Sequence, residues 1–308
     1  MSNCICRGRG LTIAASMSCR LPIRSGARLL FAVLVFTVAV RAANPAELKF
    51  TQVNRSVIEQ RLRAFSTNDG EREAGLKKLF EQSGCAGDRL SEQPVKHESL
   101  PNVICTLPGE TDEVVIVGAH FDHVNRGDGV VDNWSGAALL PSLYVSLSSS
   151  KRRHTYVFVG FTGEEHGLIG SAFYAKSLPP DRRAQVQAMV NIDSVGLSPT
   201  KVWVSHSDGK LLALLAAVAK AVQLSVHRVD VEQVGSADSE SFAKVKIPRI
   251  TIHSVTQETL KILHSPDDRL DAIKLDDYYD TYRLMAAYLT FLDGYLGENP
   301  GATQATAN

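Results

Sequence analysis

Two adjacent glutamates, Glu164 and Glu165, follow an apolar run at Val157–Phe161 and precede a histidine and a glycine. Two like charges at the end of a buried strand are costly unless something positive compensates them. Adjacent residues that leave a strand point in different directions, so one carboxylate can bind a cation while the other faces a substrate. A bound cation would also lower the cost of holding both charges close together. The pair therefore indicates a cation site in which the two glutamates have different tasks.

Other acids and histidines also lie at the ends of predicted strands or in loops beside helices. They are His120 and Asp122 in AHFDHV, Asp132 in GDGVVDNWSGAA, Asp193 in VNIDSVG and His264 in LHSPDDRLD. Imidazole and carboxylate ligands together suit zinc, and less often cobalt or manganese. The set is larger than one catalytic zinc requires, which favours a site for two metal ions. These residues indicate a metallohydrolase, but their spacing alone does not bring them together in space.

Each of these residues also has an ordinary structural explanation. His120 and Asp122 could form a structural hydrogen bond, although a carboxylate in that position would also orient a histidine ligand. Asp132 or the asparagine after it could be the N-cap of the following helix. The SPDD sequence at Ser265–Asp268 is typical of a helix start, which would place His264 in an ordinary loop.

The elements that must position these residues alternate between apolar strands and helices. Strands are predicted at 102–109, 114–118, 154–162, 184–193, 201–206 and 246–254. Helices are predicted at 54–65, 71–82, 135–148, 167–178, 210–222 and 275–296. This alternation predicts an α/β fold with a mixed, mostly parallel sheet covered by helices on both faces. Functional residues in such sheets gather beyond the carboxyl ends of the strands, where these acids and histidines lie.

The first 42 residues contain six arginines and no acidic residue. Within them, the apolar run Leu29–Val40 is too short for a comfortable membrane span and is typical of a signal-peptide core. Small residues at Val40 and Ala42 predict cleavage after Ala42 and export to the periplasm or the extracellular space. An uncleaved signal that anchors the protein in a membrane is the alternative. Either Met1 or Met17 could be the true start.

The rest of the chain is predicted to be a single domain at residues 43–296, followed by a disordered tail at 297–308. It carries 27 basic and 33 acidic residues, so its charge gives no reason to expect nucleic-acid binding. No second apolar run of spanning length follows, so no stable membrane association is expected after cleavage, and the oligomeric state is left open. Cys85 and Cys105 are expected to form a disulfide in an oxidising compartment, with two separate buried thiols as the alternative.

Several blocks of the sequence together resemble the M28 family of zinc peptidases, the co-catalytic aminopeptidases. They are VGAHFDHV, GVVDNWSGAA, FTGEEHGLIGSAFYA, NIDSVG, ADSESFAKVKIPRI and LHSPDDRLD. The blocks occur in the family's order from about Ile104 to the C-terminal helix, and this order makes the resemblance specific. It implies a three-layer sandwich with a mixed eight-stranded sheet between helices.

The resemblance also implies two zinc ions, each held by three side chains. His120, Asp132 and Asp193 would bind one ion. Asp132, Glu165 and His264 would bind the other, with Asp132 as the bridging ligand. Asp122 would orient His120.

The implied reaction is hydrolysis of the N-terminal bond of a peptide by a metal-activated water. Glu164 would act as the general base, and would then return the proton to the leaving amine. The implied protein is an exported zinc-dependent exopeptidase, an aminopeptidase with peptide substrates.

Two features depart from the family pattern. Many relatives have Asp-His where this chain has Asp238-Ser239, which changes no ligand but is expected to alter the polarity of the pocket. The loop between His120 and Asp132 is compact, and no inserted protease-associated domain is visible, so an open, minimal enzyme is expected. The polar residues of that loop are either substrate contacts or part of a solvated loop: His123, Arg126 and Asp128.

Three other functions compete with the aminopeptidase. Glutaminyl cyclases have a similar fold, but use a single zinc ion for an intramolecular acyl transfer. The DNWSGAA sequence looks more like a peptidase than a cyclase. A non-catalytic binding module is disfavoured because Glu164 and every expected ligand are present. Carboxypeptidase action, or hydrolysis of a non-peptide amide, is the remaining alternative.

Overall fold

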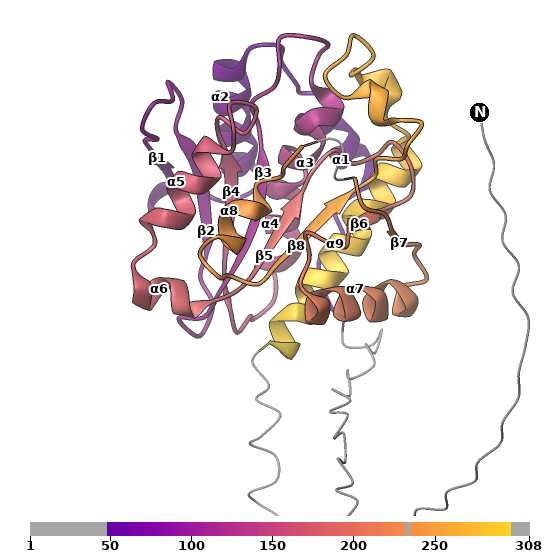
Figure 1. Ribbon diagram of the computed structural model, residues 1–308. Coiled ribbons are helices and arrows are strands. Elements are labelled where there is room, and N and C mark those ends of the chain that lie inside the picture. Colours follow the sequence, from indigo (N-terminus) through magenta and orange to yellow (C-terminus); the bar gives the residue numbers. More distant parts are fainter. Residues whose placement is uncertain (1–47, 232–234, 297–308) are drawn as a thin grey trace, which may run out of the picture. The chain divides into compact units, whose positions relative to one another are not determined.

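A mixed eight-stranded sheet forms the centre of the computed structural model (Figure 1), which describes residues 48–231 and 235–296. The strand order is β1-β2-β4-β3-β5-β8-β6-β7. The bounds are β1 Leu90–Gln93, β2 Asn102–Leu107, β3 Val114–His120, β4 Thr155–Phe161, β5 Val186–Ile192, β6 Lys201–Trp203, β7 His227–Arg228 and β8 Arg249–His253. Strands β4, β3, β5 and β8 run parallel at the centre. The predicted α/β class and mixed sheet are therefore confirmed.

Helices cover both faces of the sheet (Figure 1). They are α1 Arg55–Leu62, α2 Asp69–Gln82, α3 Ser135–Ala137, α4 Leu140–Ser148, α5 Ile169–Ser177, α6 Pro180–Gln185, α7 Gly209–Ala221, α8 Ser239–Ala243 and α9 Leu275–Tyr295. Val115 and Val117 of β3 join one apolar cluster, with residues of α2, α4, α7 and α9. Val114 and Ile116 join the other, with residues of α5 and α8. Successive residues of β3 thus face opposite helical layers, as the twofold alternation of a strand requires.

The central strands end at the same edge of the sheet. His120 of β3 pairs in register with Phe161 of β4, and the backbone N–H of Asp193, just after β5, donates to the carbonyl of Ile252 in β8. All seven residues of β3 are buried, which explains the continuous apolar run in its sequence. Side chains that follow these strands are therefore brought to one place.

The structure differs from the predicted elements in two segments near the predicted site residues. The helix predicted at 135–148 is split into α3 and α4, with Pro141 in the first turn of α4. Proline is tolerated there because the first turn needs no intrahelical N–H donor, whereas a continuous helix would require one. The predicted helix start at Ser265–Asp268 is wrong: this segment forms turns, and α9 begins at Leu275.

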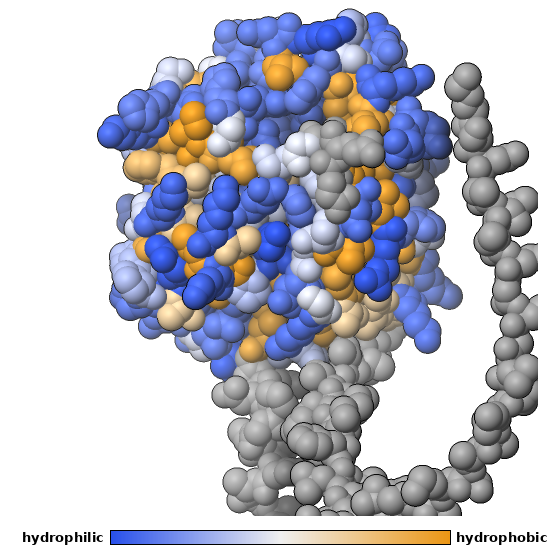
Figure 2. Space-filling view, in the orientation of Figure 1, coloured by the Kyte–Doolittle hydropathy of each residue, from blue (hydrophilic) through white to orange (hydrophobic). Residues whose placement is uncertain are grey.

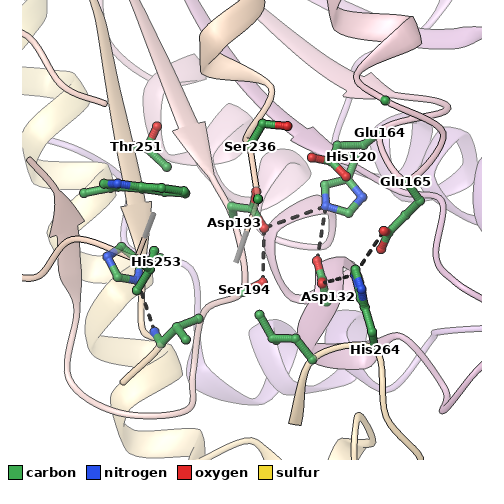
Figure 3. Close-up of a pocket in the computed structure, with 16 residues that line it drawn as sticks. His120, Asp132, Glu164, Glu165, Asp193, Ser194, Ser236, Thr251, His253 and His264 are labelled. Carbon is green, nitrogen blue, oxygen red and sulfur yellow. Dashed lines mark hydrogen bonds and ion pairs between the residues drawn. The ribbon is translucent and has the colours of Figure 1, made fainter. Parts of the chain in front are cut away.

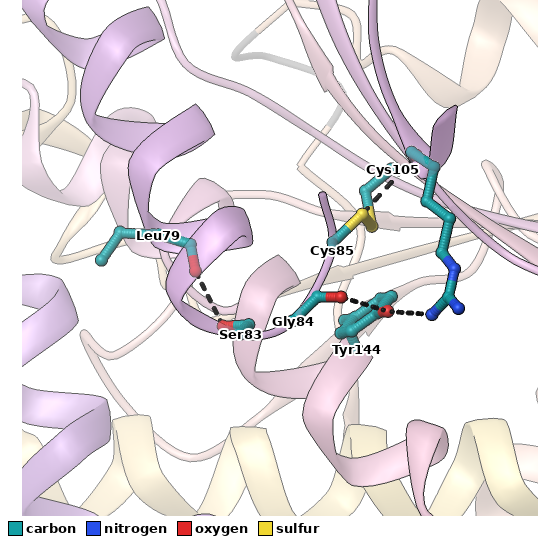
Figure 4. The surroundings of a disulfide bond; sticks show 7 residues. Leu79, Ser83, Gly84, Cys85, Cys105 and Tyr144 are labelled. Atoms are coloured by element: carbon teal, nitrogen blue, oxygen red, sulfur yellow. Dashed lines mark hydrogen bonds between the residues drawn. A yellow bond between two sulfur atoms is a disulfide. The ribbon is translucent and has the colours of Figure 1, made fainter. Parts of the chain in front are cut away.

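Cys85 and Cys105 form a disulfide that links the segment after α2 to β2 (Figure 4). The pairing predicted from the two cysteines is therefore found in the structure. The signal peptide predicted at 1–42 and the tail predicted at 297–308 lie outside the described residues.

Hydrophilic side chains cover most of the face shown in Figure 2, and hydrophobic ones form separate patches between them. This mixture is usual for a surface in contact with water. Within the described residues, no helix combines the length and apolar character needed to cross a bilayer.

Candidate metal centre

All the predicted site residues except Asp122 line one cavity at the carboxyl edge of the sheet (Figure 3). His120 ends β3, Glu164 and Glu165 follow β4, and Asp193 follows β5. Asp132 lies in the turn at Val130–Trp134 before α3, and His264 lies in the loop before α9. The common register of the parallel strands brings the first four together, and two loops supply the others.

Asp132 stands between the two histidines, with one carboxylate oxygen toward each. Its Oδ1 is 3.3 Å from Nε2 of His120, and its Oδ2 is 3.2 Å from Nε2 of His264. Nε2 of His120 is also 3.7 Å from Oδ1 of Asp193, and Nε2 of His264 is 3.0 Å from Oε2 of Glu165. Asp132 thus lies between two pairs of predicted ligands, His120 with Asp193 and His264 with Glu165.

Asp122 is placed differently from the sequence prediction. The group nearest Nδ1 of His120 is the backbone carbonyl of Asp122 at 3.2 Å, whereas the Asp122 carboxylate is 3.7 Å away. That carboxylate instead accepts the backbone N–H groups of Glu164 and Glu165, each at 3.1 Å. Asp122 therefore orients His120 mainly through its main chain, and its side chain fixes the backbone of both glutamates.

Asn133, which the sequence indicated only as a possible helix cap, makes the structural hydrogen bonds at this turn, so that the neighbouring Asp132 side chain faces the site. Its Oδ1 accepts the N–H of Gly136 at 2.9 Å, as a helix cap does, and the N–H of Ser194 at 3.1 Å. Its Nδ2 donates to the carbonyl of Ile192 at 2.9 Å. The asparagine satisfies the helix start and attaches it to the end of β5, which leaves the Asp132 carboxylate to the site.

None of the polar side chains proposed in the 121–131 loop lines the cavity. His123 is buried, and its Nδ1 lies 2.7 Å from Oδ1 of Asp69 at the start of α2. Arg72 of α2 is also fully buried, and donates to the carbonyls of Phe121 at 3.0 Å and Gly129 at 2.9 Å. The loop is therefore held by α2. Sequence reasoning missed Arg72, because an arginine on a polar helix gives no local signal of burial.

The cavity has a volume of about 240 Å³ and contains an excess of acidic groups. Four carboxylates and the two ligand histidines line it, and within the described residues no lysine or arginine does. Burial, together with the carboxylates of Asp238, Asp193 and Asp132, raises the pKa of Glu164 to about 10, although His120 opposes the shift. Hydrogen bonds to Asp132 and Glu165 raise the pKa of His264 to about 10. Such a site favours positively charged occupants.

The donor atoms fit a metal such as zinc. Oε1 of Glu165 is buried and, among the described residues, has no hydrogen-bond partner, as expected of a ligand oxygen kept for a cation. Donor atoms lie within 4.8 Å of one another in two groups, His120, Glu164 and Asp193, and His120, Asp132 and Glu165. Glu164 belongs to one of these groups, so distances alone do not separate the base from the ligands.

The side of the cavity away from His264 is uncharged (Figure 3). His253 lies there, with the Trp203 ring 6.4 Å from its own and with Val255, whose N–H it accepts. His253 is 2% exposed; its Nε2 donates to the carbonyl of Val229, and its Nδ1 accepts the N–H of Val255. Burial lowers the pKa of His253 to about 4, so the ring is neutral at pH 7. This half of the cavity suits an uncharged group.

Asp238 and Ser239 do not line the cavity, although a direct effect on its polarity was expected. Both are completely buried. Ser239 acts one residue away, because its Oγ accepts a hydrogen bond from Oγ1 of Thr251, which does line the cavity. Burial raises the pKa of Asp238 to about 7.

Two curated relatives have similar sequences. An aminopeptidase of Pseudomonas aeruginosa is 33% identical over 114 residues, which are 37% of this chain and 21% of the relative. A probable leucine aminopeptidase of Trichophyton verrucosum is 25% identical over 240 residues, 70% of this chain and 64% of the relative. The chain thus spans less than two thirds of the length of either relative.

Solved structures share the fold. The Legionella pneumophila LapA aminopeptidase has a TM-score of 0.69 at 20% identity, over 81% of this chain and 74% of that one. A zinc aminopeptidase of Bacillus subtilis has a TM-score of 0.57 at 22% identity, over 62% and 49%. An Acidobacteriales bacterium glutaminyl cyclase has a TM-score of 0.63 at 18% identity, over 83% of this chain and 97% of that chain. At these identities the likeness shows the fold alone.

The family comparison covers every predicted site residue. The parts of the fold outside the match are α1, α2, β1 and the end of α9. The model of peptidase family M28 matches residues 102–289, more than half of the 308 residues. The match includes His120, His264, Asp132 and the glutamate pair. The chain therefore belongs to peptidase family M28.

Proposed function

We propose that this protein is an aminopeptidase that binds two zinc ions and hydrolyses the N-terminal bond of peptides. The observation that carries the proposal is the position of Asp132, whose two oxygens face two different imidazoles at 3.3 and 3.2 Å. A carboxylate in this position suits a ligand shared by two ions, His120 and Asp193 completing one set and Glu165 and His264 the other. The names of the relatives support the aminopeptidase activity.

Zinc in this site would polarise the scissile carbonyl and acidify the attacking water. Glu164 takes the proton from that water as its oxygen bonds to the carbonyl carbon. It then delivers the proton to the amine nitrogen as the carbon–nitrogen bond breaks, so the carboxylate is regenerated. The Asp122 carboxylate holds the backbone of Glu164 during both transfers. Burial and nearby carboxylates raise the pKa of Glu164, so positive charge in the site would lower it again and favour the ionised base.

The uncharged half of the cavity would receive the side chain of the substrate's first residue. Trp203 stacks on His206 with ring centroids 3.9 Å apart, which makes this wall rigid. Val255, whose backbone N–H donates to His253, supplies further apolar surface. We therefore expect uncharged N-terminal residues to be preferred over lysine, arginine, aspartate and glutamate, which would lose their hydration there.

The test combines metal analysis with a substrate panel. Elemental analysis of the mature protein is expected to find two zinc ions per chain. Aminoacyl-nitroanilides with uncharged side chains are expected to be hydrolysed, and peptides blocked at the N-terminus are expected to be stable. Hydrolysis from the C-terminus, or of internal bonds only, would show that the peptidase is not an aminopeptidase.

A glutaminyl cyclase is the second candidate, because the solved cyclase aligns over 97% of its own length. A peptide with N-terminal glutamine separates the two functions. A cyclase releases ammonia and leaves the peptide bond intact, whereas an aminopeptidase releases free glutamine. One zinc per chain, with cyclisation as the reaction, would reverse the assignment.

We also propose that the protein is exported after removal of residues 1–42. The apolar run Leu29–Val40 and the small residues before position 43 support this proposal, and so does the disulfide, since disulfides persist in oxidising compartments. N-terminal sequencing of the protein from the cell exterior or periplasm is expected to begin at Ala43. An intact leader on membrane-bound protein would favour the anchored form.

A further inference from the structure

His264 differs from the other candidate ligands in how it is supported. It lies on a loop, its side chain is 52% exposed, and its φ is 54°, a backbone region that a histidine adopts only when its surroundings enforce it. The side chains of His120, Asp132, Glu165 and Asp193 are at most 15% exposed. Something outside the ligand set must therefore hold the His264 loop against the site.

Asp268, four residues after His264, makes that connection. It is 2% exposed, although it is an acid in a surface loop. Its Oδ1 accepts the backbone N–H of Val131 at 2.6 Å, and its Oδ2 accepts the N–H of Asp132 at 3.2 Å. Its own carbonyl accepts the N–H of Asp128 at 2.8 Å. Three hydrogen bonds thus join the His264 loop to the segment that carries the bridging aspartate.

The two loops also touch directly. A Cβ built on Gly127 would lie 2.3 Å from the carbonyl oxygen of Ser265 and 3.1 Å from that of Asp268. A side chain at position 127 would therefore push the loops apart. Gly127 has a φ of 85°, so glycine suits both the backbone conformation and the close approach.

Other roles for the Asp268 carboxylate do not fit its position. It does not line the cavity, so it neither contacts a substrate nor completes a metal ligand set. It does not cap α9, which begins seven residues later at Leu275. Both of its oxygens are used on backbone N–H groups of the neighbouring segment.

We propose that Asp268 is a positioning residue that fixes His264 relative to Asp132 and so sets the affinity of the His264 side of the site for zinc. The proposal rests on the proposed zinc function. His120 and Asp193 are attached to β3 and β5 and do not depend on this connection. Loosening it should therefore affect the zinc bound by His264 and Glu165 more than the zinc bound by His120 and Asp193.

The experiment compares Asp268→Asn with Asp267→Asn. The asparagine at 268 keeps the shape and one acceptor, but turns an NH₂ group toward a backbone N–H. Asp267 lies in the same loop, and its exposed side chain makes it a matched control. Zinc affinity is measured by titrating each protein against a chromophoric zinc chelator, and thermal unfolding shows whether each variant is folded.

Asp268→Asn is expected to weaken one of the two zinc ions, the one assigned to His264 and Glu165, by about 10- to 100-fold, the usual effect of losing a hydrogen bond that supports a ligand. The other zinc should change far less, and Asp267→Asn should match the wild type. Equal affinities in all three proteins would overturn the proposal, and so would equal weakening of both ions in Asp268→Asn.

The same titration separates this proposal from the proposed function. A wild-type protein that binds one zinc ion contradicts the two-metal function. The role of Asp268 is then tested by the affinity for that single ion, for which Asp132 is still an expected ligand. A loss of about 10-fold or more in Asp268→Asn but not in Asp267→Asn supports the positioning role, and no loss overturns it.

Discussion

The two edges of the central sheet each hold a buried histidine surrounded by acids. His120 ends β3 at the carboxyl edge, whereas His154 directly precedes β4 at the opposite edge. They are 1% and 0% exposed. Around His154, Asp293 accepts the backbone N–H groups of Arg153 and His154, both at 2.9 Å, and lies 3.2 Å from the His154 ring. Arg153 pairs with Glu113 at 3.1 Å.

The difference between the edges lies in the balance of charge and donors. At the His154 edge an arginine and two backbone N–H groups bind two carboxylates, so the charges are balanced within the chain, although Nε2 of His154 is buried without a hydrogen-bond partner among the described residues. At the His120 edge two imidazoles face four carboxylates, and a Glu165 oxygen is buried without a partner among the described residues. A histidine beside acids is therefore not in itself a metal site. The His120 edge differs from the His154 edge because its carboxylate oxygens outnumber the hydrogen-bond donors around them.

The largest effect is expected for Glu164→Gln. The amide cannot take a proton, so the rate of aminoacyl-nitroanilide hydrolysis should fall by about 10²- to 10⁴-fold. Zinc content should stay at the wild-type value, because Glu164 is assigned to proton transfer. Stopped assays and elemental analysis of the same preparation measure both quantities. A near-normal rate would remove Glu164 from the mechanism, and loss of zinc would make it a ligand.

The next largest effect is expected from zinc removal, which should lower the thermal stability through the His120 edge but not through the His154 edge. Zinc binds the folded site and stabilises it by about 4 kcal/mol when its concentration is a thousand times the dissociation constant. A chelator should therefore lower the melting temperature of the wild type. The decrease should be smaller in His264→Ala, which lacks a ligand, and unchanged in His154→Gln. If His154→Gln also lost the response to zinc, the two edges would not be independent.

Much of the His120 edge could be predicted from the sequence, because its residues follow apolar strands. Because functional residues gather beyond the carboxyl ends of parallel strands, the apolar runs indicated one edge of the sheet for His120, Glu165 and Asp193, whereas their convergence on one site was implied by the family resemblance. The sequence pattern also predicted a mixed sheet between helical layers, whereas the number of eight strands was implied by the family resemblance. The short elements β1, β7, α6 and α8 were missed, since two to six residues carry too little periodicity to be seen.

The supporting residues could not be predicted in the same way. Asn133 and Asp268 act through hydrogen bonds to backbone groups 60 or more residues away, and SPDD looks locally like a helix start. Arg72 is buried by contacts with carbonyls rather than by an apolar face. The histidine at 154 carried no strand-end signal, because it precedes its strand. The local sequence pattern indicates which residues can act as ligands or bases. The residues that hold them in place depend on contacts between distant parts of the chain, which the local pattern does not reveal.

His253 extends the comparison to another buried histidine, one that burial keeps neutral. Burial lowers its pKa to about 4, so between pH 4 and 6.5 the unfolded chain binds the proton and the folded chain does not. Stability should therefore fall as the pH decreases through this range, by up to about 3 kcal/mol from this group. Urea unfolding of the wild type and of His253→Gln at several pH values measures it. The advantage of the wild type over the variant should shrink toward pH 4; a constant difference would contradict the shift.

The smallest effect is expected for Asp293→Asn at the His154 edge. Burial alone would raise the pKa of Asp293, but hydrogen bonds from His154 and two backbone N–H groups outweigh it and lower the pKa. A lowered pKa means that the carboxylate stabilises the fold above its unfolded pKa near 4 and loses this effect as the pH falls through the folded value. The variant should lose about 1.5 kcal/mol of unfolding free energy at pH 7, since one acceptor remains, and much less near pH 3. Urea unfolding at the two pH values measures the loss, with zinc content as the control. Since this edge answers its own charges, the variant should keep all its zinc; a loss of zinc would show that the two edges are coupled through the strands between them.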